Sequence, residues 1–349
     1  MRKLRIGYSP YSANLTHPGD RRRLVYWAKK RGHELVLDTE SKCDVIFKTV
    51  RSDLNDGRGS NKKAPYILDL VDGYLGPEDY WRDWFRGAGK VVTGQISGLI
   101  KPFQKIIESA CRDASAVVCE TSEQVRTIEP FCKNVHSILD FHEEFPFIPY
   151  KEDSLNNRST SLLWEGFPYT AKGLLLLRDF FASNTESNSV SLEMVTDLRY
   201  PIIFGKYFSK STASIVNEIM VILGSRFQIT EWDLGSVISA SNRANIAVLP
   251  LDPKGALNPL KAENRLLIMW RLGLPTLTSP SSAYLRVMNE LKIDGICQNS
   301  EEWTKKLRNL IESPALQKDM VNAGQQYVRD THSEELVLRA WDNLFDSVL

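Results

Sequence analysis

The sequence predicts two α/β domains in tandem, each built on a doubly wound, mostly parallel β-sheet. The chain has 349 residues, which suits two domains of roughly 150 residues each. Short apolar segments alternate with amphipathic ones along nearly the whole chain, as expected for βαβ units. The alternation breaks at 145–161, where FPFIPYKEDSLNNRSTS combines prolines, charges and a polar run. We expect this segment to link a domain at 1–150 to one at 155–330.

In the first half, each predicted strand is a short apolar run between polar residues, glycine or proline. Gly32 marks the end of the first long helix, because glycine readily takes the left-handed conformation that follows a helix. The predicted strands are Leu4–Tyr8, Glu34–Leu37, Asp44–Lys48, Tyr66–Leu70, Ala116–Cys119 and Val135–Leu139. The predicted helices are Arg21–Arg31, Lys101–Cys111 and Ser122–Ile128.

The same pattern restarts after the linker. Asn245–Leu251 is a continuous apolar run of the kind that is buried on both faces of a parallel sheet. The other predicted strands are Ser161–Glu165, Val190–Val195, Phe227–Glu231 and Thr276–Ser279. The predicted helices are Gly173–Ser183, Ser214–Leu223, Leu234–Asn242, one ending at Leu272, Ala283–Leu291 and Glu301–Ile311.

Composition excludes several classes of protein. The net charge of +1 lacks the basic excess of nucleic-acid-binding proteins, so we expect no nucleic-acid partner. The five cysteines include no CxxC pair, which argues against a disulfide framework or zinc ribbon and favours the cytoplasm. No apolar run is long enough for a transmembrane segment. Peripheral contact with a membrane surface remains compatible with the sequence.

The segment 245–279 is the most informative for chemistry. It predicts a buried strand, a loop and a helix with Asn258 as its N-cap and Pro259 at its first position. Lys261 and Arg265 are four residues apart and would share one face of the opening turns. Because helix N-termini at strand ends attract anions, a diphosphate is a plausible ligand. The alternative is that these cations are solvated on an exposed helix face.

A second candidate segment is SLLWEGFPYTAKGLLLL, at the start of the second half. Gly166 follows the predicted strand, and Lys172 stands at the start of the next helix. Glycine permits a close backbone approach, and the lysine can reach an anion. The alternative is that Lys172 is an ordinary surface residue.

The order of these parts resembles glycosyltransferase family 4 and its relatives, which share the GT-B fold. The resemblance covers nearly the whole chain and rests on five pieces in sequence: RGHEL (31–35), DASAVVCETSEQ (113–124), WEGFPYTAKG (164–173), NIAVLP (245–250) and NRLLIMWRLGLPTLTS (264–279). It implies two Rossmann-like domains facing a central cleft, with the second domain binding a nucleotide sugar.

The sequence departs from the family at important positions. The acidic residue that usually precedes Gly-x-Pro by five positions, and binds the donor ribose, is Ile268 here. Its partner acid eight positions earlier is Leu260. Either Glu263 or Glu165 substitutes for this pair, or the donor is held differently. The first-domain strand that often ends in histidine and an acid reads Val71-Asp72, which makes Asp72 a catalytic candidate.

Other motifs are weaker or missing. The loop SPYSANLTHPGD brings His17 and Asp20 close to a possible acceptor site; the alternative for His17 is an ordinary loop residue. There is no Asp-x-Asp, GxGxxG, GxxxxGK[ST] or GxSxG, which disfavours metal-dependent transferases, dehydrogenases, P-loop proteins and hydrolases. We therefore expect no metal and no cofactor, with the nucleotide diphosphate sugar acting as donor substrate.

The predicted function is a metal-independent glycosyltransferase that moves a sugar to a hydroxyl acceptor, such as a sugar or a lipid-linked glycan. The resemblance implies retention of anomeric configuration. Lys172, Arg265 and Asp72 are the catalytic candidates. The donor-binding candidates are Gly166, Lys172, Asn258, Lys261, Glu263 and Arg265. Two alternatives stay open: a nucleotide-sugar-binding protein without turnover, and a nucleotide-sugar epimerase.

The C-terminal segment 332–349 is predicted to be an amphipathic helix. Ser333 suits its N-cap, and Trp341 and Phe345 belong to an apolar stripe at helical spacing. The resemblance implies that this helix packs back on the first domain. The alternative is that it caps the second domain.

Overall fold

The computed structural model describes residues 2–37, 42–56, 64–76, 80–152, 159–183, 190–201, 209–255 and 257–349. Their contacts divide the chain into two compact units. The first unit comprises 1–142, 259–262 and 332–349, and the second comprises 143–258 and 263–331. No helix in these described ranges is long and apolar enough to cross a membrane.

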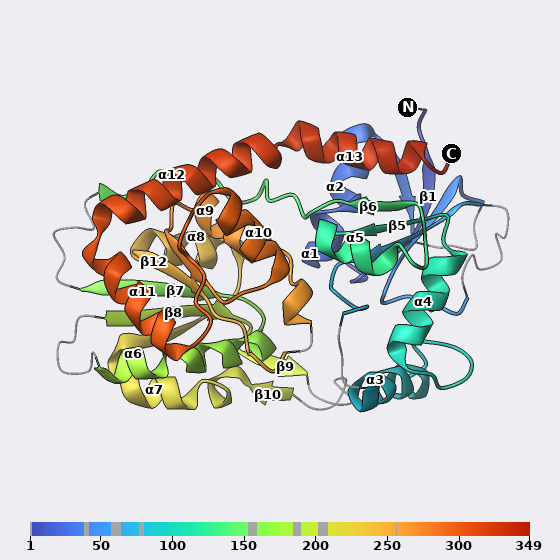
Figure 1. The fold of residues 1–349 in the computed structure, drawn as a ribbon. Coiled ribbons are helices and arrows are strands. Elements are labelled where there is room, and N and C mark those ends of the chain that lie inside the picture. Colours follow the sequence, from blue (N-terminus) through green and yellow to red (C-terminus); the bar gives the residue numbers. More distant parts are fainter. Residues whose placement is uncertain are drawn as a thin grey trace. The chain divides into compact units, whose positions relative to one another are not determined.

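The first unit is built on a parallel sheet of six strands in the order β2-β1-β3-β4-β5-β6 (Figure 1). The central strands β3, β4 and β5 are buried along their whole length, as expected for a sheet covered on both faces. The strands are β1 (Arg5–Ser9), β2 (Glu34–Val36), β3 (Val45–Thr49), β4 (Tyr66–Leu70), β5 (Ala116–Cys119) and β6 (Val135–Ser137). The chain reverses its winding direction between β1 and β3, so the prediction of a doubly wound sheet is confirmed.

Six helices accompany this sheet in the described part of the first unit. Gly32 follows α2 with φ 71°, as predicted for a left-handed helix end. The helices are α1 (Pro18–Arg21), α2 (Leu24–Arg31), α3 (Tyr80–Val92), α4 (Phe103–Asp113), α5 (Ser122–Ile128) and α13 (Glu334–Asp346). Helix α3 falls in a segment for which the sequence predicted no defined element.

Helix α13 belongs to the hydrophobic core of the first unit. Its N-cap is Ser333, as predicted, and its apolar stripe is buried. Trp341 and Phe345 pack among Trp27, Phe47 and their neighbours, all of which lie in the first 142 residues. Beside them, the indole Nε1 of Trp27 donates a hydrogen bond to Asp342 at 2.8 Å.

The second unit is built on a parallel sheet of five strands in the order β11-β8-β7-β12-β13. The chain winds outward from β7 to β8 and β11, then continues on the other side of β7 with β12 and β13. The strands are β7 (Thr160–Glu165), β8 (Val190–Thr196), β11 (Phe227–Glu231), β12 (Ile246–Leu249) and β13 (Thr276–Thr278). A separate antiparallel pair joins β9 (Arg199–Pro201) to β10 (Ser209–Ser211), which the sequence did not predict.

The helices of the second unit differ from prediction at one important place. The predicted helix Gly173–Ser183 is instead a 3-10 helix, η2 (Pro168–Leu177), followed by α6 (Arg178–Ser183). The remaining helices are η3 (Thr212–Ser214), α7 (Asn217–Leu223), η4 (Gly224–Arg226), α8 (Leu234–Arg243), η5 (Asn258–Leu260), α9 (Asn264–Arg271), α10 (Ser282–Glu290), α11 (Ser300–Glu312) and α12 (Pro314–Thr331). Of these, η5 spans the point where the chain passes from the second unit to the 259–262 segment of the first.

The beginning of the expected linker is packed within the second unit. The amide of Ile148 donates to the carbonyl of Arg271 at 2.7 Å, and the Arg271 Nε donates to the carbonyl of Phe145 at 2.8 Å. The Arg271 guanidinium also lies over the Phe147 ring, 4.3 Å from its centroid. These contacts hold the segment that enters the second unit against α9. Residues 153–158 of the expected linker lie outside the described residues.

Candidate functional site

The second sheet reverses its winding direction between β7 and β12, and ligands of open α/β sheets bind outside the carboxyl ends of the strands at such a point. Glu165 ends β7 and Gly166 follows it, while the loop 250–258 follows β12. Helix η2 approaches that loop closely, because a Cβ on Gly173 would lie 2.4 Å from the carbonyl oxygen of Pro250. Only glycine permits this approach. We therefore take this edge of the second sheet as the candidate site.

Arg265 brings an unsatisfied donor to this edge. Its Nη1 donates to the backbone carbonyl of Glu165 at 3.0 Å. Its Nη2 is buried and has no hydrogen-bond partner among the residues that the structure describes. Glu165 also has one unsatisfied oxygen. Its Oε1 accepts a hydrogen bond from the Trp232 indole at 2.8 Å, whereas its Oε2 is buried without a described partner. Orphaned buried polar atoms mark places where a ligand or an ordered water supplies the missing bond.

Gly166 makes room for the Arg265 guanidinium. A Cβ at this position would lie 2.7 Å from Arg265 Nη1 and 3.2 Å from Thr170 Oγ1. The carbonyl oxygen of Gly166 accepts a hydrogen bond from the Thr196 hydroxyl at 2.7 Å. The backbone at the end of β7 is thereby held by the end of β8, with the guanidinium lying directly against it.

Helix α9 begins later than the sequence predicted. Asn258 and Pro259 belong to the short 3-10 helix η5, and α9 starts at Asn264 with Glu263 in the N-cap position. Lys261 is therefore not helical, and the prediction that it shares a helix face with Arg265 is wrong. The N-cap residue of α9 makes no side-chain capping hydrogen bond in the described part of the chain, and Arg265 lies in the opening turn of this helix.

The predicted donor-binding residues separate between the two units. Asn258 donates to the backbone carbonyl of Asp252 at 2.7 Å and shapes the loop after β12. Lys261 lies in the first unit, where its ammonium pairs with Asp72 at 3.0 Å. The neighbouring carbonyl of Leu260 accepts a hydrogen bond from the side-chain amide of Gln124 at 3.1 Å. These contacts hold the 259–262 segment on the first unit.

Glu263 and Lys172 have opposite surroundings. Glu263 is buried, and its carboxylate forms an ion pair with Arg286 at 2.7 Å. Lys172 lies on η2 and is exposed to solvent. Its ammonium has no hydrogen-bond or ion-pair partner within the described ranges.

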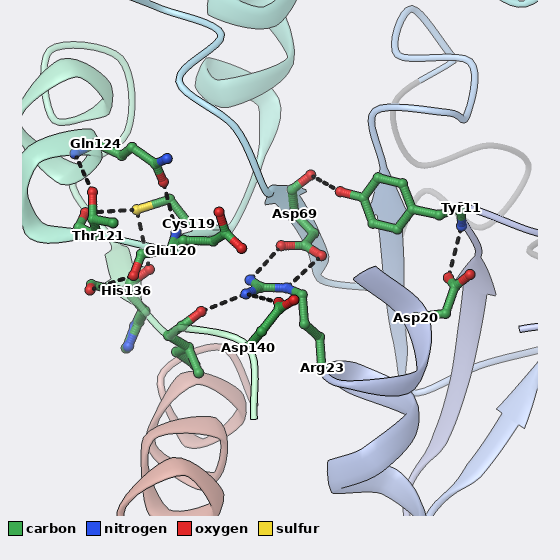
Figure 2. A network of polar contacts seen from close by, with 12 residues as sticks. Tyr11, Asp20, Arg23, Asp69, Cys119, Glu120, Thr121, Gln124, His136 and Asp140 are labelled. Carbon is green, nitrogen blue, oxygen red and sulfur yellow. Dashed lines mark hydrogen bonds and ion pairs between the residues drawn. The ribbon is translucent and has the colours of Figure 1, made fainter. Parts of the chain in front are cut away.

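A second polar cluster lies at the carboxyl ends of the strands of the first sheet (Figure 2). Arg23 is completely buried and binds Asp69 with two donors, Nη2 at 2.7 Å and Nε at 3.2 Å. Its Nη1 donates to the carbonyl of Ile138 at 2.6 Å and lies 3.5 Å from Asp140. Figure 2 shows the guanidinium between the carboxylates of Asp69 and Asp140, with Glu120 beside them.

Burial changes the protonation of this cluster. It raises the pKa of Asp69 to about 6, although the adjacent Arg23 acts in the opposite direction. It also raises the pKa of Glu120 well above its usual range, and the nearby Asp140 carboxylate adds to this effect. Glu120 therefore keeps its proton to a higher pH than a solvated glutamate does.

The loop after β1 is organised around Asp20. The buried carboxylate of Asp20 accepts from the Tyr8 hydroxyl at 2.5 Å and from the backbone amides of Tyr11 and Ser12 at 2.8 and 2.9 Å. His17 caps α1, because its Nδ1 accepts from the Gly19 amide at 3.0 Å. Burial lowers the pKa of His17, so its neutral, accepting form is favoured. Both residues hold the loop in shape.

Sequence reasoning missed Arg23, Glu120 and Asp140. Arg23 lies in the first turn of the predicted helix Arg21–Arg31 and looks like any surface arginine there. Glu120 and Asp140 each stand just after a predicted strand, which was a usable signal, since side chains at the ends of parallel strands converge. Within the described residues, no cluster of histidine, cysteine, aspartate or glutamate has the arrangement of a metal site.

No protein-family model matches the sequence, and no curated protein matches it. Solved structures do match. The structure of HepE from Anabaena, in complex with UDP and glucose, aligns with a TM-score of 0.68 at 14% identity and covers 99% of this chain and 100% of HepE. A glycosyltransferase from Rickettsia africae aligns with a TM-score of 0.65 at 12% identity, over 100% and 99% of the two chains.

TarM aligns with a TM-score of 0.62 at 12% identity, covering 92% of this chain; the chain spans 57% of the length of TarM. Together with the two parallel α/β sheets, these alignments show that the chain has the GT-B fold of glycosyltransferases. The predicted fold class is thus confirmed.

Proposed function

We propose that this protein is a glycosyltransferase that moves a sugar from a nucleotide diphosphate sugar to a hydroxyl group of an acceptor. The observation that carries the proposal is the placement of Arg265, whose Nη1 is fixed by the Glu165 carbonyl and whose Nη2 lacks a described partner. It stands in the opening turns of α9, at the switch point of the second sheet. The structure of HepE with UDP and glucose, which has the same fold, supports this choice of ligand.

The chemistry follows from charge. The leaving diphosphate gains negative charge as the glycosidic bond breaks, so cations held beside it stabilise the transition state more than the ground state. Arg265, the backbone amides that open α9 and the solvent-exposed Lys172 supply positive charge from the chain itself. We propose that the reaction proceeds on these groups without a metal or a cofactor, and with retention of anomeric configuration.

The remaining roles are assigned by position. Glu165 is proposed to bind the donor ribose in place of the missing acids, because its Oε2 is buried without a described partner and its backbone carbonyl holds Arg265. Glu263 is already paired with Arg286 and is assigned to shaping the α9 N-terminus. Asp72 lies in the first unit, paired with Lys261, and is proposed to bind the acceptor hydroxyl. The acceptor is proposed to be a sugar or a lipid-linked glycan.

A transfer assay tests the proposal. The protein is incubated with UDP-, GDP- and dTDP-sugars and a panel of sugar acceptors, and nucleotide release and glycoside formation are measured. One donor should be turned over. We expect Arg265→Ala to lower turnover at least about 100-fold, as loss of a transition-state donor does. Lys172→Ala should lower it less. The control is Arg178→Ala, which removes an exposed cation from α6 and should leave the rate unchanged.

A protein that binds a nucleotide sugar without turnover is the second candidate. It is favoured by Leu260 and Ile268, which stand where the family usually has acids. Ile268 is buried in α9, and Leu260 lies against Gly73, so both positions are occupied by packed apolar side chains. Tight binding with no product over long incubation would support this candidate. An acceptor-independent change in the sugar would identify an epimerase instead.

A further inference from the structure

Helix α3 turns its apolar side to solvent. Trp81, Phe85 and Val92 are 65%, 65% and 69% exposed. Together with Ala88 they occupy positions i, i+4, i+7 and i+11, which lie on one face of a helix. An amphipathic helix of a globular protein ordinarily buries such a face.

The opposite face of α3 is polar and is bound to the rest of the first unit. Asp83 is only 4% exposed, and its two carboxylate oxygens accept from the Gln104 amide at 2.9 and 3.2 Å. Gln104 lies in the first turn of α4, so Asp83 serves as an anion at a helix N-terminus. Gly87 allows close contact here, since a Cβ would lie 1.9 Å from the Lys101 carbonyl oxygen.

Two cations complete this inward face. The Arg86 guanidinium lies 4.9 Å from the centroid of the Phe103 ring, and the Lys90 ammonium lies 4.7 Å from it. Burial lowers the pKa of Lys90 to about 8. Specific polar contacts thus fix the rotation of α3, and the outward direction of its apolar face is a consequence of them.

Further exposed hydrophobic side chains follow α3 in the sequence. Large exposed hydrophobic side chains of the described residues concentrate between positions 80 and 100, and we call this set the α3 patch: Tyr80, Trp81, Phe85, Val92, Leu99 and Ile100. Figure 1 shows α3 beside α4 in the first unit. Exposed apolar patches of this kind mark interaction surfaces.

Charge decides which partner fits. Exposed Arg82 and Lys101 flank the α3 patch. Lys105 is also exposed, and its ammonium pairs with Glu108 at 3.0 Å. From 78 to 105 the sequence holds five basic and three acidic residues, a net charge of +2. The cores of protein–protein interfaces are depleted of lysine. A membrane interface instead accepts tryptophan and tyrosine rings at headgroup depth, with lysine and arginine beside lipid phosphates.

We propose that the α3 patch docks on the surface of an anionic lipid bilayer. The helix would lie in the plane of the interface, with Trp81 and Phe85 entering the boundary between headgroups and acyl chains. Arg82 and Lys101 would face the anionic headgroups. The proposal does not depend on glycosyl transfer and can be tested without any donor or acceptor.

Vesicle flotation tests the proposal with the full-length protein. We expect the protein to float with vesicles of phosphatidylcholine and phosphatidylglycerol, to float far less with phosphatidylcholine alone, and to be released partly by high salt. The double variant Trp81→Ser/Phe85→Ser should bind at least roughly tenfold more weakly, because each ring loses its apolar burial. Val221→Ser is the matched control: its side chain is 74% exposed on α7, and its removal should not change binding.

Because the substituted side chains are exposed, thermal unfolding of the double variant should match that of the wild type, which separates docking from folding. The proposal is overturned if the wild type does not bind anionic vesicles or if the double variant binds equally well. It is also overturned if Val221→Ser loses as much binding. Self-association of the wild type that the double variant abolishes, without vesicle binding, would assign the patch to a second copy of the chain instead.

Discussion

The ring of Phe345 stacks on the indole of Trp27, with centroids 4.2 Å apart and planes inclined by 14°. This contact joins the last helix of the chain to the second. Trp341 stacks on the same indole at 6.3 Å, and both α13 rings are fully buried. Helix α13 is therefore a structural part of the first unit, although the entire second unit separates it from α2 in the sequence.

Replacement of Phe345 by alanine should destabilise the first unit by about 3–5 kcal/mol, because it removes a buried aromatic ring and leaves a cavity. Urea denaturation, followed by tryptophan fluorescence, measures the effect. Leu349→Ala is the control, since Leu349 is 54% exposed and should change the free energy of unfolding by less than about 0.5 kcal/mol. Equal stability of Phe345→Ala and wild type would show that α13 does not belong to this core.

Glu120→Gln tests the buried carboxyl cluster. Glu120 has a pKa that burial raises well above its usual range, so the folded protein keeps a proton that the unfolded chain releases. Wild-type stability should therefore fall relative to the variant as the pH rises above the ordinary glutamate pKa. Glutamine resembles the protonated acid, so the variant should lose this pH dependence.

The comparison is made by urea denaturation at several pH values between about 5 and 8, the range above the usual pKa of a glutamate. The difference in free energy of unfolding between variant and wild type should grow with pH in favour of the variant. If the free energies of unfolding of the two proteins change equally with pH, or if the wild type becomes more stable relative to the variant as the pH rises, Glu120 is ionised in the folded protein. The groups that face it, namely Asp140, Arg23, Asp72 and Lys261, are unchanged in this experiment.

Gly166→Ala should displace the guanidinium of Arg265. The added Cβ would lie 2.7 Å from Nη1, so the side chain or the end of β7 must shift, at a cost of about 1–3 kcal/mol. The substitution should weaken nucleotide binding more than it lowers the free energy of unfolding. Calorimetric titration measures the first effect, and thermal unfolding measures the second. Gly89→Ala is the control, because an added Cβ there meets nothing within 4 Å. If Gly166→Ala binds the nucleotide as tightly as the wild type, Gly166 is not part of the binding site.

Much of the fold could be predicted from the sequence where local patterns and tertiary packing agree. The predicted strands Tyr66–Leu70 and Ala116–Cys119 and the predicted helix Ser122–Ile128 match the observed bounds. Each strand is a short apolar run buried on both sides, and the helix is capped by Thr121, whose side chain accepts from the Gln124 amide. In such segments burial and capping require the same residues that the local pattern indicates.

The rest depends on tertiary contacts that no local pattern contains. Asn258 and Pro259 have the right chemistry to begin a helix, yet they form a 3-10 turn. Contacts with the first unit, including the packing of Leu260 on Gly73, determine the path of residues 259–262. Helix α9 therefore starts only at Asn264. Helix α3 was likewise not predicted, and the direction of its apolar face depends on the contacts of Asp83 and Gly87 with the segment 101–104. Arg23 is buried beside two acids that are distant from it in the sequence, Asp69 in β4 and Asp140 after β6.

The central claim is that the second unit binds a nucleotide diphosphate sugar on Arg265, and calorimetric titration tests it most directly. UDP, GDP, dTDP and their sugars are titrated into wild type, Arg265→Ala and the control Arg178→Ala. We expect one ligand to bind wild type and control equally, and Arg265→Ala at least about tenfold more weakly, as expected on loss of a charge-assisted hydrogen bond. Binding to none of the ligands, or equal binding by Arg265→Ala, would contradict the claim.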